Sequence, residues 1–283
     1  MTTEKTIGNP GRKLFFGLFV FPLLIAVGMT VLLCTVVLLT NEKETPESLI
    51  AAIKSGSPSK RWQKAFELSN ELNNNPNAIR TSGIRNEVMH ILGDSAHYDE
   101  KTRGYMAMTL GRFQGPESVA ALKRALKDES MDVKVYAVWS LGVLKASDAA
   151  DDIAFFLSSE NQELRKTAAY VLGALGSKTY KEVLLPLLED TAADVRWNAA
   201  LSLARLGSDA GQKVLIRMLD RSELAAQGLS EAEMEAVMVN AVKGLALINK
   251  EEAFQILQEA SKNEKSLKVR QAALNVMQEK RAL

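Results

Sequence analysis

The sequence of 283 residues is poor in the residue types that build most catalytic and metal centres. It has one cysteine, Cys34, and two histidines, His90 and His97, so it allows no internal disulfide and no cluster with the spacing of zinc ligands. It also lacks a glycine-rich phosphate loop and a strained turn that would expose a nucleophilic serine. We therefore predict no catalytic, cofactor-binding or metal-binding residues, and a protein that is not an enzyme.

Two further absences narrow the class of protein. The 35 lysines and arginines are balanced by 34 aspartates and glutamates, which gives a formal net charge of +1. Domains that bind nucleic acid carry an excess of basic residues, so we predict no nucleic-acid partner. No segment alternates between apolar and polar residues over a useful length, and we therefore predict no strands.

What the sequence does contain is a block that recurs down its length. Its basic anchor residue occurs at Arg103, Lys134, Arg165 and Arg196, at intervals of 31 residues. Allowing for insertions, further copies are anchored at Arg61, Met238 and Arg270, which makes seven units. A fixed period of this size indicates a solenoid of stacked units rather than one closed core.

Each unit carries the pattern of two helices. In the recurring block, small or apolar residues stand three, four and seven positions after the anchor, as at Ala168, Ala169 and Leu172, which places them on one helical face. A second amphipathic stretch follows, as at 118–126, and glycines such as Gly176 mark the turns. The fold class predicted is all-α: an α-solenoid of about seven helix pairs, preceded by one transmembrane helix.

The block also carries a recognisable motif. Val-Arg-x-x-Ala-Ala-x-x-Leu, as at 195–203, resembles the short HEAT-like repeats that are common in bacteria, the type first described in phycobilisome lyases. Residues 46–280 fit the resemblance, most closely 103–207. It implies a helical solenoid but not one function, because such arrays serve as scaffolds, adaptors, lyase subunits and transport factors. Met238 departs from the pattern, since it replaces the usual basic residue.

The N-terminal region has a different character. Residues 14–39 contain no charge, and this run exceeds the roughly 20 residues that a helix needs to cross a bilayer. The apolar region of a cleaved signal peptide is shorter, about 7 to 15 residues. Lipid attachment at Cys34 is disfavoured because Leu33 precedes it where a small residue is expected. We predict a tail over 1–13, an uncleaved single-pass transmembrane helix over 14–40 and a HEAT-like repeat solenoid over 41–283.

The orientation follows from the basic residues beside the apolar run. Lys5, Arg12 and Lys13 precede it, whereas Lys43 and Lys54 follow it. Because lysine and arginine favour the cytoplasmic side, we expect the N-terminus inside and the solenoid outside the cytoplasm. This places the protein in the inner membrane of a bacterial cell, with a periplasmic soluble domain.

The basic anchors are the main candidate site. They should stack along one edge of the array, with Asp132, Glu163 and Asp194, each two residues before an anchor, as partners in adjacent repeats. The favoured interpretation is a structural ladder, and the alternative is a groove for an anionic or acidic peptide. Beside the anchors, Tyr136 and Trp197 are candidate partner-binding residues, whereas most of the other aromatic residues are expected in the core between repeats. The candidate residues are Arg103, Lys134, Tyr136, Arg165, Arg196, Trp197 and Arg270.

One unit is longer than the others. Its surplus of about eleven residues falls within 221–233 and includes the capping-box pattern Ser230-x-x-Glu233. Inserts of this type usually project from one face of a solenoid. The insert therefore either projects as an element of its own or lengthens the helix that follows.

Three functions remain open on these grounds. The first is a membrane-anchored scaffold or adaptor that holds a protein partner near the bilayer. The alternative is an accessory subunit of a multi-subunit membrane complex, in which the transmembrane helix itself packs on other subunits. The third, a lyase-like enzyme subunit, needs a reactive cysteine or an acid–base pair that the sequence does not offer. The first two imply protein partners at a membrane, and the predicted anchor also argues against the third.

Overall fold

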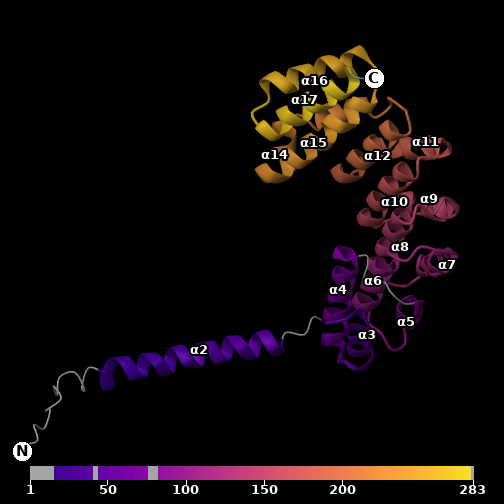
Figure 1. The fold of residues 1–283 in the computed structure, drawn as a ribbon. Coiled ribbons are helices and arrows are strands. Elements are labelled where there is room, and N and C mark those ends of the chain that lie inside the picture. Colours follow the sequence, from indigo (N-terminus) through magenta and orange to yellow (C-terminus); the bar gives the residue numbers. More distant parts are fainter. Residues whose placement is uncertain (1–15, 41–43, 76–81, 282–283) are drawn as a thin grey trace, which may run out of the picture. The chain divides into compact units, whose positions relative to one another are not determined.

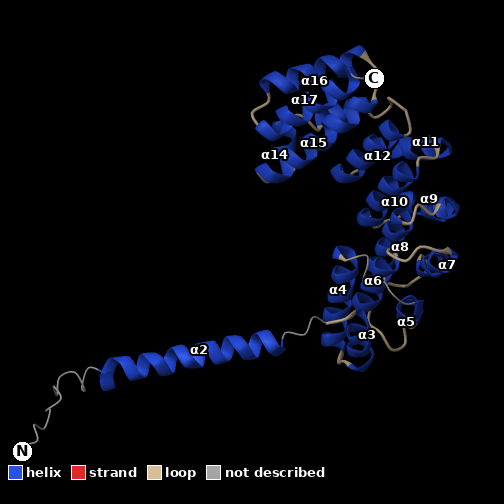
Figure 2. Ribbon diagram, viewed as in Figure 1, coloured by secondary structure: helices blue, strands red, loops and turns tan. Residues whose placement is uncertain are grey.

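The computed structural model describes residues 16–40, 44–75 and 82–281. These residues form helices and connecting turns, and no strand occurs among them (Figure 2), which confirms the all-α prediction. The chain divides into two compact units, Met1–Thr45 and Pro46–Leu283. The tail expected over 1–13 lies outside the described residues.

The first unit contains one long apolar helix. It starts with a π-helical turn, η1 (Phe16–Val20), and continues as α2 (Phe21–Thr40). The segment Leu18–Val36 has a mean hydropathy of 2.5 and none of it is buried, and it is the one described helix that is long and apolar enough to cross a membrane. A helix of this kind near an N-terminus is either a membrane anchor or a signal sequence.

The second unit is an array of helices in which each predicted anchor position lies on a helix of its own. The array curves, and the anchor helices α6 to α12 lie along its inner side with the intervening helices on the outer side (Figure 1). The anchor helices are α4 (Pro58–Asn74), α6 (Glu100–Leu110), α8 (Met131–Val143), α10 (Gln162–Leu175), α12 (Ala193–Arg205), α15 (Glu231–Leu247) and α17 (Leu267–Arg281).

The helices between them are shorter and less regular. Two of these segments alternate between α-helical and 3-10 turns, so that the outer side is built from short pieces. The elements are α3 (Pro46–Ser55), α5 (Ser82–Gly93), α7 (Pro116–Ala125), η3 (Ser147–Ala149), α9 (Ala150–Ala154), η4 (Phe155–Ser158), η5 (Lys178–Tyr180), α11 (Lys181–Leu184), η6 (Leu185–Glu189), α13 (Gln212–Arg217), α14 (Arg221–Ala226) and α16 (Glu251–Asn263).

The core runs along the array between the two rows of helices. The residues three, four and seven positions after the five anchors from Arg103 to Met238 are buried, as Ala168, Ala169 and Leu172 are on α10. One apolar cluster extends from Leu49 to Leu206 and a second from Ala200 to Met277, so both draw on α12. This distribution is the quasi-one-dimensional packing of a repeat protein, in which each unit buries its surface against its neighbours.

Adjacent anchor helices approach closely at small residues. A Cβ atom placed on Gly173 of α10 would lie 2.6 Å from the Cα atom of Ser202 on α12. The Ser202 hydroxyl donates a hydrogen bond of 2.8 Å to the Ala169 carbonyl oxygen, and Ser140 donates one of 2.9 Å to Ala107 between α8 and α6. Glycine and serine at these positions therefore join successive repeats directly.

The insertion of the long unit forms a helix of its own, and the anchor helix after it has 17 residues, against 13 in α12. Arg221–Ala226 forms the separate short helix α14, and α15 then starts at a capping box. The Ser230 backbone N–H donates to the Glu233 carboxylate at 2.8 Å, and the Ser230 hydroxyl accepts from the Glu233 N–H. Between them Gly228 has a φ of 78°, which favours glycine.

Candidate protein-interaction surface

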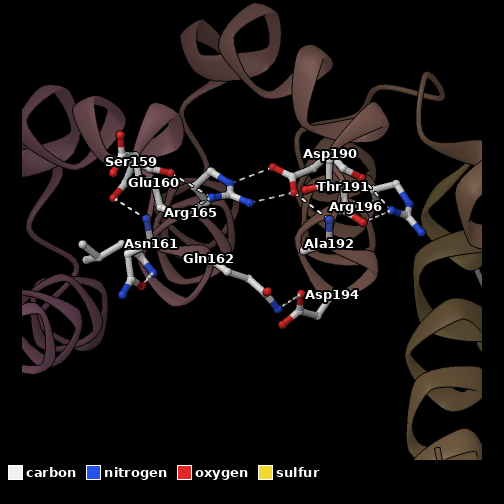
Figure 3. A network of polar contacts seen from close by, with 11 residues as sticks. Ser159, Glu160, Asn161, Gln162, Arg165, Asp190, Thr191, Ala192, Asp194 and Arg196 are labelled. Carbon is white, nitrogen blue, oxygen red and sulfur yellow. Dashed lines mark hydrogen bonds and ion pairs between the residues drawn. The ribbon is translucent and has the colours of Figure 1, made fainter. Parts of the chain in front are cut away.

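Two of the basic anchors bridge successive repeats through an aspartate. Arg165 donates from Nε and Nη2 to both carboxylate oxygens of Asp190, at 2.7 and 2.9 Å, and from Nη1 to the Ser159 carbonyl oxygen at 2.8 Å (Figure 3). Arg103 binds Asp128 in the same way, at 3.2 and 2.8 Å. Hydrogen bonding to Arg165 and the N–H of Ala192 lowers the pKa of Asp190, and the same bond to Asp190 raises the pKa of Arg165.

These carboxylates are not the ones predicted as partners. Asp128 and Asp190 stand 25 residues after their arginines, in the turn before the next anchor helix. There each also accepts a backbone N–H, from Ser130 and from Ala192, at 2.9 Å. The aspartates two residues before an anchor instead lie in the first turn of the anchor helix itself, so they turn to another face.

The other anchors do not form this bridge. Lys134 has no ion pair among the described residues, and Ser159 occupies the position 25 residues later where an aspartate would stand. Arg196 and Arg270 each donate only from Nη1, to carbonyl oxygens five and six residues earlier. The charge missing at Met238 is supplied by Arg221 of α14, whose Nε donates to Glu264 at 2.7 Å.

A row of aromatic side chains crosses the anchor helices. Tyr105 of α6 stacks on Tyr136 of α8 with ring centroids 6.1 Å apart, and Trp139 of α8 stacks on Tyr170 of α10 at 5.4 Å. Phe66 of α4 meets Tyr105 edge-on at 5.3 Å. The row ends at Arg205 of α12, whose guanidinium carbon lies 5.0 Å from the centre of the Tyr170 ring.

The row borders a groove of about 450 Å³. Trp139 is 43% exposed there, and Tyr136 and Tyr170 are half-buried. Trp139 and Tyr170 were expected in the core between repeats, whereas Tyr136 was a candidate partner-binding residue. The groove is lined by Met108, Val135, Tyr136, Trp139, Glu163, Lys166, Thr167, Tyr170 and Asn198. This large apolar floor with few polar groups is typical of a binding groove.

The groove lining contains one acidic and one basic side chain, Glu163 and Lys166, and further carboxylates lie on the same anchor helices. Asp132, Glu163 and Asp194 recur on α8, α10 and α12, and Lys166 lies between two of them, 2.6 Å from Glu163 and 3.7 Å from Asp194. Burial, followed by Tyr105 and the carboxylates of Asp132 and Glu163, raises the pKa of Tyr136, so its hydroxyl stays neutral.

Of the candidate residues from the sequence, the structure brings only Tyr136 to this groove. Arg103 and Arg165 are engaged by aspartates, and Arg196 and Trp197 line a separate small pocket beside α14. Sequence reasoning missed Trp139 and Tyr170. The signal available for them was their position, because both stand five residues after an anchor, on a face that the core residues do not share.

The fold and this surface define the chain as an α-solenoid repeat protein. The sequence profile of HEAT repeats matches residues 87–154 and 153–229, together half of the chain. The chain therefore belongs to the HEAT-repeat family, as the motif indicated. None of the curated proteins matches this sequence.

Solved structures share the fold at low sequence identity. The complex of CpcE and CpcF of phycocyanin lyase from Nostoc sp. PCC7120 is 19% identical with a TM-score of 0.56, over 85% of this chain and 96% of that one. An engineered protein is 18% identical with a TM-score of 0.47, over 82% and 67%. A designed armadillo repeat protein in complex with the peptide (KR)4 is 15% identical with a TM-score of 0.45, over 83% and 99%.

Proposed function

We propose that this chain is a membrane-anchored scaffold that binds an extended segment of a partner protein in the groove across α8 and α10, without catalysis of its own. The observation that carries the proposal is the row of partly exposed aromatic rings. Their faces are already ordered by stacking on one another, so a partner binds them at a small cost in side-chain entropy. Aromatic side chains of this kind dominate the energetics of protein interfaces.

The charges around the groove indicate what the partner segment carries. Arginines bound by aspartates within the chain are not available to an acidic peptide, whereas Asp132 acts on the Tyr136 hydroxyl and has no ion pair among the described residues. A segment with apolar side chains for the groove and lysine or arginine beside them matches both features, because basic groups also stack on aromatic faces. The acidic-peptide groove considered from the sequence is therefore not the function we propose.

The membrane part of the proposal is supported by the apolar helix η1–α2. None of the segment Leu18–Val36 is buried within the chain, as an anchor in contact with lipid requires. We propose a single-pass helix in the inner membrane, with the repeat unit on the periplasmic side.

The groove is tested by site-specific crosslinking in cells. A photoreactive phenylalanine analogue at position 139 should capture a partner protein, and the same analogue at position 155 should not. Phe155 is a suitable control because it is 78% exposed on η4, outside the groove. Trp139→Ala and Tyr170→Ala should reduce recovery of the captured partner from solubilised membranes at least tenfold, with the helical circular dichroism unchanged. Equal capture from both positions would contradict the proposal.

The accessory-subunit alternative is distinguished by an exchange of the anchor. Replacing residues 14–39 with an unrelated transmembrane helix should preserve binding of the captured partner if the groove is the binding site. Loss of that binding, with the chain still in the membrane, would favour a helix that packs on other subunits.

A further inference from the structure

Arg196 makes the same backbone contacts as Arg165 but, like Arg270 in the last helix of the array, binds no carboxylate among the described residues. Its Nη1 donates to the carbonyl oxygens of Asp190 and Thr191, at 2.6 and 3.0 Å, as Arg165 does one repeat earlier. In Figure 3 the guanidinium group of Arg165 reaches across to the carboxylate of Asp190. The guanidinium group of Arg196 contacts backbone carbonyl oxygens alone. Its Nε and Nη2 have no partner among the residues that the structure describes.

The insertion explains why this carboxylate is missing. In the regular repeats the acceptor stands 25 residues after the arginine, and for Arg196 that position is Arg221, the first residue of α14. The neighbouring Asp220 is the N-cap of α14, and its carboxylate accepts the backbone N–H of Ser222 at 2.8 Å and of Glu223 at 3.3 Å. It is therefore held by the helix it caps and does not reach Arg196.

The insertion and Arg196 both line a small pocket. The pocket has a volume of about 30 Å³, close to the space of two water molecules or of one carboxylate group. α12 contributes Arg196 and Trp197, and Gln227 follows α14. Its own acidic residue, Glu223, is occupied, because Nε of Arg217 donates to both of its carboxylate oxygens at 3.1 and 2.8 Å.

We infer that this pocket binds a carboxylate supplied from outside the chain, an aspartate or glutamate side chain of a protein partner, in the place that Asp190 takes on Arg165. The chain itself shows the chemistry that such a guanidinium group binds, because Arg103, Arg165 and Arg221 each hold an aspartate or a glutamate between successive repeats. The planar fork of arginine matches two carboxylate oxygens, and the indole of Trp197 forms one wall. The pocket lies outside the aromatic groove, and the inference depends on the proposed function only for the source of the carboxylate.

The test uses the full chain in lipid nanodiscs with 5-fluorotryptophan, observed by fluorine NMR. The three tryptophans, Trp62, Trp139 and Trp197, each give one signal, assigned by single replacement with phenylalanine. Trp197 reports on the pocket and Trp139 on the groove, so failure of one site is distinguishable from failure of the other. The probes are sodium acetate, sodium chloride at the same ionic strength, and the blocked tripeptides Gly-Glu-Gly and Gly-Gln-Gly.

We expect a saturable shift of the Trp197 signal with acetate and with the glutamate peptide, and none with chloride or the glutamine peptide. Arg196→Gln should weaken both responses at least tenfold. Gln227→Glu introduces a carboxylate into the pocket, so this variant should fold and show neither response. It keeps the test decisive if Arg196→Gln does not fold. Arg205→Gln, a change outside the pocket, should leave them intact.

Three results would overturn the inference. These are the absence of a saturable shift, an equal response to chloride, and a response that persists in Arg196→Gln. A response to acetate without one to the glutamate peptide would overturn the partner as the source of the carboxylate, because the pocket would then admit only free small carboxylates.

Discussion

Separating Arg165 from Asp190 should cost about 3 kcal/mol of unfolding free energy. Their side chains are 15% and 11% exposed, and the Asp190 carboxylate accepts three hydrogen bonds, two from Arg165 and one from the Ala192 N–H. Loss of Asp190 leaves all three donors without a partner. An unpaired buried group costs about 1–3 kcal/mol, more if charged, whereas breaking a fully buried ion pair costs about 3–5 kcal/mol. The small remaining exposure places this pair between the two ranges.

The assay is a double-mutant cycle with Asp190→Ala, Arg165→Ala and the double variant, measured by urea unfolding at 222 nm. We expect a coupling energy of about 1–3 kcal/mol. The matched control is Arg217 with Glu223, which has a similar bond length of 2.8 Å but side chains 60% and 43% exposed. Its coupling should stay below about 1 kcal/mol because solvent screens exposed pairs.

The pH dependence provides a second measurement on the same pair. The pKa of Asp190 is lowered in the folded protein, mainly by its bond to Arg165. Its contribution is therefore complete above the ordinary aspartate pKa of about 3.9 and is lost as the pH falls through the folded value. The stability difference between the native protein and Asp190→Asn should shrink in that acidic range. A coupling energy no larger than that of the control pair, or a difference that does not change with acid, would refute the structural role of the bridge.

Three further outcomes are expected. Gly173→Ala should destabilise the array by about 1–3 kcal/mol, because the new methyl group overlaps the backbone of α12, whereas Gly93→Ala, with no atom within 4 Å of its new Cβ, should be close to neutral in the same urea assay. Arg221→Ala should lower the free energy of unfolding by about 1–3 kcal/mol, because Glu264 loses its ion-pair partner. Hydrogen exchange should then rise first in α16 and α17. Protease added to intact spheroplasts should digest the repeat unit, and protection until lysis would reverse the orientation that we propose.

The fold was accessible from the sequence because its determinants are local and repeated. A basic residue every 31 positions, with small residues three and four positions later, specifies the same helix and the same packed face in each unit. A segment that is ambiguous alone can be assigned from its copies in the other units. The structure agrees with the predicted number of helix pairs and turns, and it has no strand among the described residues. The long apolar helix was equally readable, since the segment Leu18–Val36 is helical and by length and composition could cross a membrane.

The site depended on contacts that no sequence spacing specifies. The sequence pointed to the basic anchors but assigned their partners to carboxylates two residues earlier, whereas Asp190 reaches Arg165 because the turn between helices carries it back to the edge of the preceding repeat. The spacing of Trp139 and Tyr170 from their anchors sets them off the core face, but only the packing of successive helices brings their rings together at a groove. The open fork of Arg196 likewise exists because α14 turns the carboxylate of Asp220 toward its own N-terminus. Helical periodicity is local and readable in one chain, but which side chains meet between units is set by tertiary packing.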